Sequence, residues 1–131
     1  MKRTAFHPEG VAKPGGHYSH AIIAEAGRTL YVAGQVSLDK DGNLVAAGDP
    51  EGQTRQVLQN LKQIIEEAGG KLDDVAKTTT YVTKLEYRGP VGKVREEFLK
   101  GDPPANTLAV VSSLAHPNFL VEIEAIVPLS S

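Results

Sequence analysis

The sequence predicts an α+β fold in which two helices cover one face of a mixed six-stranded sheet. Two segments, 52–68 and 92–99, carry apolar residues at the three- and four-residue spacing of an amphipathic helix. Strand-like segments precede, separate and follow these two helical segments. They are rich in β-branched residues or alternate apolar with polar residues. The predicted order is therefore strands, helix, strand, helix, strands.

The first part of the chain is expected to supply three strands. A short strand covers residues 2–6, and a loop rich in proline and glycine follows because it cannot continue that strand. Gly27 and Arg28 form a tight-turn signal. This signal predicts that segments 21–26 and 29–36 pair as an antiparallel hairpin.

The middle of the chain alternates helix and strand. The first helix is expected to end at Gly69, since glycine supplies the left-handed conformation of a helix C-terminus at no steric cost. A strand rich in β-branched residues follows at 75–82. In the second helix the apolar residues recur on one side, and the charged ones are expected on the solvent side. These charged residues are Lys93, Arg95, Glu96 and Glu97.

The segment 120–127 has the strict alternation of a strand. Its apolar residues at odd positions alternate with Glu122, Glu124 and Ile126, so two carboxylates share a sheet face. An unpaired carboxylate is too costly to bury. Because two helices cannot cover both faces of the sheet, we expect this bare face to meet another copy of the chain. The alternative is an ordinary solvated strand face.

The composition narrows the class of protein. A chain of 131 residues usually makes one domain, and we expect a single domain over residues 1–131. The net charge of -2 and the aromatic content of 5% argue against a nucleic-acid partner, which needs basic and stacking surfaces. The absence of cysteine excludes disulfides within the chain and thiolate zinc sites. Neither a signal peptide nor a membrane span is expected, so the predicted location is the cytoplasm.

Six segments spread over nearly the whole chain carry a recognisable pattern: 18–21, 30–36, 53–61, 68–79, 104–105 and 121–125. Together they resemble the RidA/YjgF family, the reactive-intermediate imine deaminases also known as L-PSP endoribonucleases. The resemblance implies a chorismate-mutase-like α+β domain that forms a homotrimer. In that trimer three sheets line a central barrel, and an active site lies in each cleft between subunits.

In deaminating members of that family, an enamine such as 2-aminoacrylate, or its imine tautomer, is hydrolysed to a 2-keto acid and ammonia without a cofactor. The resemblance implies that Glu122 is the catalytic carboxylate, which orients or deprotonates the attacking water. It implies that Tyr18 closes the cleft, that the Gly34 backbone approaches the ligand, and that backbone groups of Thr107 and Leu108 bond to it. The alternatives are structural: an interface ring at Tyr18, relief of strand crowding at Gly34 and a satisfied interface ion at Glu122.

Histidines are the remaining candidates. His17 stands beside Tyr18 and could supply a proton near neutral pH, so it joins the candidate substrate-binding residues. A metal site built from His17, His20, His116 and Glu122 is not expected, because their spacing matches no ligand pattern.

One position departs from the family pattern. Active members follow a Pro-Ala pair with an arginine that holds the substrate carboxylate, whereas this chain has Asn106 there. An amide cannot replace the guanidinium fork, and the loss is worth roughly 1.5 to 3 kcal/mol, or ten- to a hundredfold in binding. Asn106 can still donate to a neutral carbonyl, and Gly92 replaces a residue that is often asparagine. We therefore expect a member of an arginine-lacking subgroup.

Three functions stay open at this point. The first is hydrolytic deamination of a small enamine, imine or amide-like molecule whose recognition does not depend on a carboxylate clamp. The second is a non-catalytic trimer that binds small molecules or acts like a chaperone, which the retention of Glu122 disfavours. The third is the endoribonuclease activity of the family's older name, which the low positive charge and few aromatic residues disfavour.

Overall fold

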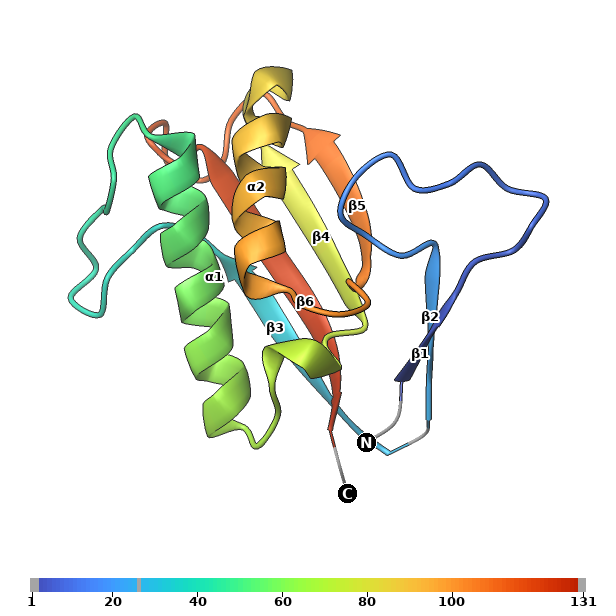
Figure 1. Cartoon of the computed structure of the whole chain (residues 1–131). Helices are drawn as coiled ribbons and strands as arrows, with labels where there is room; N and C mark the ends of the chain where they lie inside the picture. Colours follow the sequence, from blue (N-terminus) through green and yellow to red (C-terminus); the bar gives the residue numbers. More distant parts are fainter. Residues whose placement is uncertain (1–2, 26, 130–131) are drawn as a thin grey trace.

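The computed structural model describes residues 3–25 and 27–129, and its centre is a four-stranded mixed sheet. The strand order is β3-β6-β4-β5; β4 and β5 run parallel, and the other neighbours run antiparallel. A separate two-stranded sheet, β1-β2, lies on the β5 side of the molecule (Figure 1). The strands are β1 (Arg3–Phe6), β2 (Ala21–Ala24), β3 (Arg28–Gln35), β4 (Lys77–Val82), β5 (Ala105–Val110) and β6 (Val121–Leu129).

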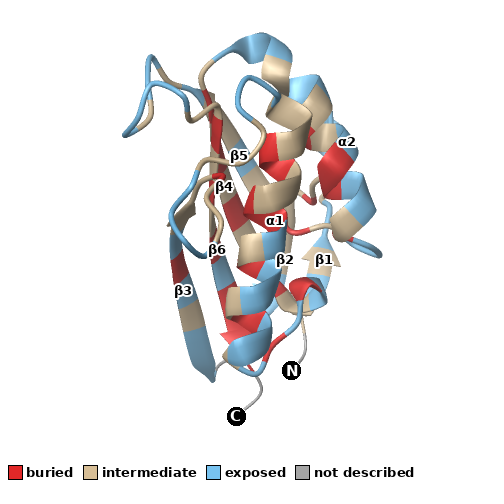
Figure 2. Ribbon diagram, turned by 90° about the vertical axis from the view of Figure 1, so that its left-hand side faces the viewer, coloured by how far each residue is buried: buried red, intermediate tan, exposed pale blue. Residues whose placement is uncertain are grey.

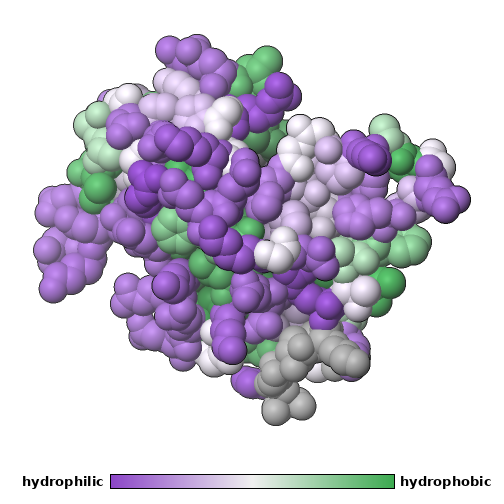
Figure 3. Space-filling model, in the orientation of Figure 1, coloured by the Kyte–Doolittle hydropathy of each residue, from purple (hydrophilic) through white to green (hydrophobic). Residues whose placement is uncertain are grey.

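Two helices, α1 (Pro50–Glu67) and α2 (Arg88–Phe98), cover one face of the larger sheet, as the sequence predicts (Figure 1, Figure 2). Their outer surface is mainly hydrophilic (Figure 3). Neither is long and apolar enough to cross a membrane, and the described residues contain no other α-helix. The core lies between helices and sheet, where each buried aliphatic side chain contributes roughly 1.5 to 3 kcal/mol. Its fully buried members include Val57, Leu58, Leu61, Ile65, Val91, Val94, Val121, Ile123 and Val127.

Both helices begin earlier than the sequence pattern predicts. The first begins at Pro50, because proline fits the first helical position, where its missing N–H loses no hydrogen bond. The second begins at Arg88, and Pro90 lies in its first turn, where proline is likewise tolerated. Apolar periodicity locates the interior of a helix but does not mark its first turn.

The alternation predicted for β6 is confirmed. Its odd-numbered residues are buried toward the helices, whereas Glu122 and Glu124 are partly buried and Ile126 is 37% exposed on the opposite face. Tyr31 of β3 lies beside Ile126 in register and is 74% exposed. Within residues 3–25 and 27–129 of a single chain, nothing therefore covers the face of the sheet away from the helices.

The α+β class is confirmed, but the six strands divide into two sheets, and the predicted hairpin between β2 and β3 is wrong. β2 pairs with β1 instead, with Phe6 opposite Ala21. β3 pairs with β6, because Leu30 and Val32 on this strand pack against the core. A turn signal is local, whereas the apolar surface that a strand buries decides its partner. Two ends of predicted strands, at positions 2 and 26, lie outside the described residues.

Candidate functional site

Glu122 lies on the uncovered face of the sheet, directly beside Gly34 of β3. The register of β3 against β6 shifts between Val32 and Gln35, so Gly34 stands at an irregular point of the strand. A Cβ added at Gly34 would lie 1.9 Å from Oε2 of Glu122 and 2.9 Å from its Cγ. The missing side chain therefore lets the carboxylate lie over the β3 backbone. The structure brings these two predicted site residues together.

The surroundings of Glu122 make its carboxylate more basic. Partial burial raises the pKa of Glu122, and the negative charge of Glu124 raises it further. The Tyr81 hydroxyl donates to Glu124 over 3.1 Å, and this hydrogen bond raises the pKa of Tyr81. Within the described residues no side chain or backbone group donates a hydrogen bond to the Glu122 carboxylate. Its oxygens are therefore free to accept hydrogen bonds from a water molecule or a ligand.

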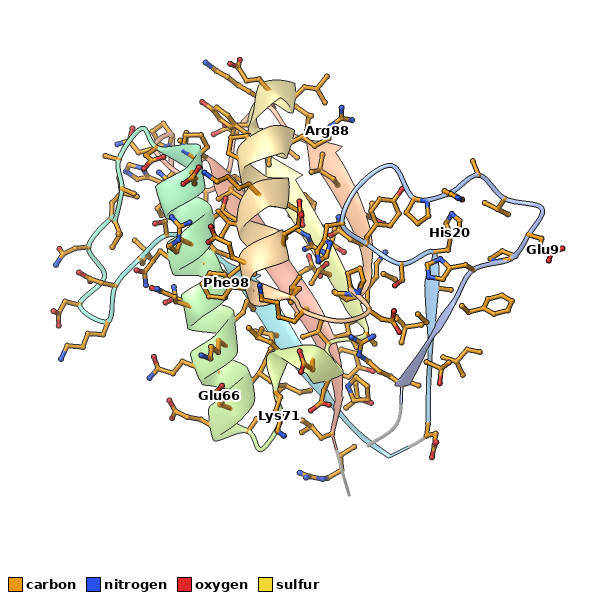
Figure 4. All side chains as sticks on the ribbon, viewed as in Figure 1. Glu9, His20, Glu66, Lys71, Arg88 and Phe98 are labelled. Carbon is orange, nitrogen blue, oxygen red and sulfur yellow. The ribbon has the colours of Figure 1, made fainter. Side chains whose placement is uncertain are left out.

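Four other predicted residues line one cavity on the helix side of the sheet. The cavity measures about 740 Å³, a size typical of small-molecule sites, and lies between the loop before β2, helix α2 and strand β5. Arg88 projects from the first turn of α2 toward the end of β5 at this side of the molecule (Figure 4). The predicted residues in the lining are His17, Tyr18, Asn106 and Leu108.

Asn106 is held by hydroxyl groups on β4. Its Oδ1 accepts hydrogen bonds from Thr78 over 2.8 Å and from Thr80 over 2.9 Å, and both threonines are buried. Two donors on one oxygen fix the plane of the amide. The amide N–H groups have no acceptor among the described residues. They are therefore available to a ligand in the cavity.

The loop that carries His17 and Tyr18 is attached to the rest of the chain on both sides of the cavity. Nε2 of His17 lies 2.8 Å from the carbonyl oxygen of Leu99, so this ring nitrogen donates a structural hydrogen bond. The Tyr18 hydroxyl accepts from the backbone N–H of Gly15 over 3.3 Å. Ser19 is buried, and its N–H donates to the main chain before β5 over 3.1 Å. These contacts hold the Tyr18 ring at the cavity.

The predicted residues divide between the two faces of the sheet. The Thr107 side chain lies on the uncovered face, where Nζ of Lys77 donates to its hydroxyl over 2.8 Å. The adjacent Asn106 pairs in register with Thr78, which is buried on the helix side. Glu122 lies on the uncovered side. Within one chain, Asn106 and Glu122 therefore face away from each other.

Arg95 is a residue whose predicted position is wrong. The helical pattern assigned it to the solvent side of α2, yet it is 3% exposed and lines the cavity. Its guanidinium donates to the Thr78 hydroxyl over 3.1 Å and to the His17 carbonyl over 3.4 Å. Arg95 follows Val91 and precedes Leu99 by four residues, and both are buried. That spacing puts it on the buried side of the helix and is the signal that could have located it.

The described residues contain no group of three histidine or carboxylate side chains placed to hold a metal ion. The ring of His20 packs against His7, with 5.5 Å between ring centroids. The ring of His116 packs against Phe119, with 5.3 Å between centroids. The histidines considered as metal ligands therefore have local packing partners.

Comparison with known proteins decides the family. A family model described as Endoribonuclease L-PSP matches residues 10–129. A RutC family protein of Pyrococcus horikoshii is 40% identical over 126 residues, which cover 96% of this chain and 97% of the relative. The chain belongs to the RidA/YjgF family.

Solved RidA/YjgF structures share its fold. The Rid family protein YyfB of Yersinia pestis matches with a TM-score of 0.92 at 38% identity, covering 98% of this chain and 100% of that chain. RidA from the Antarctic bacterium Psychrobacter matches with a TM-score of 0.72 at 30% identity, covering 95% and 98%. The family and the fold predicted from the sequence are thereby confirmed. The arginine-lacking subgroup, the trimer and the roles of the site residues stay predictions.

Proposed function

We propose that this RidA/YjgF protein is a hydrolytic deaminase of small enamines and imines, with Glu122 as its general base. The observation that carries the proposal is the Glu122 carboxylate lying over Gly34, partly buried and with a raised pKa. Such a carboxylate is a stronger base than one in water, and it stands beside backbone that a ligand can approach. Membership in the RidA/YjgF family, whose deaminating members hydrolyse imines, is consistent with this reaction type. The proposal includes the cytoplasmic location that the sequence predicts.

The proposed reaction consumes one water molecule. Glu122 accepts a proton from water while the water oxygen adds to the C=N carbon of the imine, and the proton passes to the nitrogen. The product of this step is a carbinolamine. Glu122 then accepts the hydroxyl proton, the C–N bond breaks, and the nitrogen leaves as ammonia with that proton. The carbon is left as a keto group, and the carboxylate is regenerated.

We place the reaction in a cleft between copies of the chain in a homotrimer. Asn106 and Glu122 face opposite sides of one sheet, so a cleft that contains both needs a neighbouring chain. The uncovered face also carries Tyr31 and Ile126, which are 74% and 37% exposed. Exposed apolar side chains on a sheet are typical of an interaction surface. In this arrangement Glu122 of one copy meets the cavity of the next, with Tyr18 at its edge.

The test measures ammonia release from 2-aminoacrylate generated in situ. Glu122→Gln keeps the shape of the side chain and removes the base, and Glu124→Gln is the matched control on the same strand face. We expect release by the wild type and the control, and a loss on the order of a hundred- to ten-thousandfold in Glu122→Gln. Undiminished release by Glu122→Gln would contradict the proposed role of the carboxylate.

Light scattering on the same samples tests the assembly, with an expected mass of three 14.0 kDa chains. A monomer that releases ammonia would contradict the shared cleft. A trimer without activity would favour the second function, a non-catalytic small-molecule binder.

A further inference from the structure

The cavity between the loop before β2, helix α2 and strand β5 contains a positive charge that has no negatively charged partner in the described part of the chain. Arg95 is almost completely buried, and the ion pairs found among the described residues involve other cations. Its hydrogen-bond acceptors there, the Thr78 hydroxyl and the His17 carbonyl, are both uncharged. Burial lowers the pKa of Arg95 to about 10, so the guanidinium stays charged at neutral pH.

A buried guanidinium without a counter-ion is unusual, because removing the charge from water costs free energy that neutral hydrogen bonds offset only in part. The group has five N–H donors. Two of them have acceptors in the described part of the chain. The remaining donors can bind an anion in the cavity that Arg95 lines.

Arg95 and Asn106 contact the same hydroxyl group. The Thr78 oxygen accepts from Arg95 over 3.1 Å and donates to Asn106 over 2.8 Å. A guanidinium from α2 and an amide from β5 thus lie on either side of one threonine, and both line the cavity. One side chain offers charge and the other offers neutral donors. The pair suits a small molecule with a carboxylate next to a carbonyl or imine.

The other charged side chains of the lining are less suited to this role. Arg88 is exposed in the first turn of α2, where water screens its charge (Figure 4). Nζ of Lys93 lies 3.0 Å from Oε1 of Glu51, so its charge is already compensated. Glu96 is exposed as well, which limits its repulsion of an anion deeper in the cavity. Arg95 is the buried cation.

We propose that Arg95 is the anion-binding residue of this cavity, and that its ligands are small carboxylates whose adjacent carbonyl or imine group lies near Asn106. The proposal rests on the proposed function only for the identity of the reacting carbonyl or imine group. The preference for a negatively charged ligand does not depend on that function. It replaces the expectation, which follows from Asn106 alone, of a ligand whose recognition does not depend on a carboxylate clamp. The positive charge missing from position 106 is supplied by α2, across Thr78.

Two unreactive probes of nearly equal size, pyruvate and its neutral amide pyruvamide, test the selection of charge without any turnover. By isothermal titration, we expect the wild type to bind pyruvate at least tenfold more tightly than pyruvamide. Arg95→Gln is expected to abolish this preference. Arg88→Gln, which removes an exposed charge at the same cavity, is the matched control and should keep it.

Arg95→Gln also loses a hydrogen bond to the loop at His17, so a second variant separates charge from structure. Asn106→Arg in the Arg95→Gln background returns a guanidinium to the cavity from β5. We expect it to restore at least a tenfold preference for pyruvate, whether or not thermal stability recovers. A purely structural role of Arg95 predicts no such restoration.

The proposal is overturned if the wild type binds neither probe, if it binds both equally, or if the preference survives in Arg95→Gln. Loss of the preference in Arg88→Gln alone would overturn it too, because Arg88 and not Arg95 would then be the anion-binding residue. A wild type that selects pyruvate but releases no ammonia from 2-aminoacrylate would uphold Arg95 and refute the deaminase. A wild type that releases ammonia but does not prefer pyruvate would refute the role of Arg95 and leave the proposed deaminase activity intact.

Discussion

Glu122 occupies the space that a side chain at position 34 would need: a Cβ on Gly34 would lie 1.9 Å from its Oε2 and 2.7 Å from its Cδ. Gly34 is not among the glycines with a positive φ, so the position needs glycine for space and not for backbone conformation. The place of the candidate base is therefore determined by two strands. The carboxylate comes from β6, and the room for it comes from β3.

Gly34→Ala is predicted to fold and to lose most of its activity. The added methyl group forces the carboxylate aside, at a cost of about 1 kcal/mol in the free energy of unfolding. Ammonia release should fall about a hundredfold, because a displacement of about 1 Å can cost that much. Urea denaturation and initial rates measure the two effects. Gly10→Ala, where a Cβ meets no atom within 4 Å, should change neither. Full activity in Gly34→Ala would show that the carboxylate position is unimportant.

The raised pKa of Glu122 predicts a pH-dependent effect of this residue on stability. The folded carboxylate binds its proton more tightly than the unfolded one, so its contribution to stability falls as pH rises from the ordinary value of 4.5 through the raised value. Glu122→Gln should therefore be more stable than the wild type at pH 7, and the gain should disappear below pH 4.5. Urea denaturation at several pH values measures it. A gain that stays constant across pH would rule out this cause.

The same group should control the lower limb of the pH–rate profile. A protonated carboxyl cannot accept a proton from water, so kcat/KM should fall as pH drops through the raised pKa of Glu122. Glu124→Gln removes the negative charge that helps to raise this pKa, and the limb should move to lower pH. Profiles of the two proteins recorded in one buffer series make the comparison. An unmoved limb would mean that the two carboxylates are not coupled.

Gln53 is predicted to be essential for stability, because it ties α1 to the chain just before β6. It is fully buried; its Nε2 donates to the Asn118 carbonyl over 3.0 Å, and its Oε1 accepts from the Leu120 N–H over 2.9 Å. Gln53→Met leaves both backbone groups unpaired and should cost about 2 to 4 kcal/mol in urea denaturation. Gln59→Met, on the exposed side of the same helix, should stay within about 0.5 kcal/mol. Equal stability of the two variants would contradict the stabilising role of the hydrogen bonds made by Gln53.

Local patterns in the sequence were sufficient for the elements but not for their partners. The alternation around Glu122 predicts which face each side chain takes, because it depends only on a period of two. The partner of β2 could not be found in this way, since β3 takes β6 as its neighbour to bury Leu30 and Val32. The helical pattern misplaces Arg95 because it assigns charged residues to the solvent side of a helix. Its burial depends on acceptors from two distant segments, Thr78 and His17.

The last prediction concerns the hydrogen bond from Thr80 to Asn106. Thr80→Val keeps the shape of a buried side chain and removes the donor, so it should cost about 1 kcal/mol. Asn106→Leu removes the acceptor. If the bond orients the amide, the double variant should cost less than the sum of the single ones by about 0.5 to 1.5 kcal/mol in urea denaturation.

Thr79→Val provides the control for this cycle, because Thr79 lies on the other face of β4 and should be additive with Asn106→Leu within about 0.5 kcal/mol. Additivity at Thr80 as well would mean that the hydroxyl does not hold the amide. Coupling at Thr80 alone would mean that β4 sets the direction of the Asn106 donors before any ligand arrives. A ligand then loses less free energy in ordering the site, so Thr80→Val should also weaken the binding of pyruvate and pyruvamide alike.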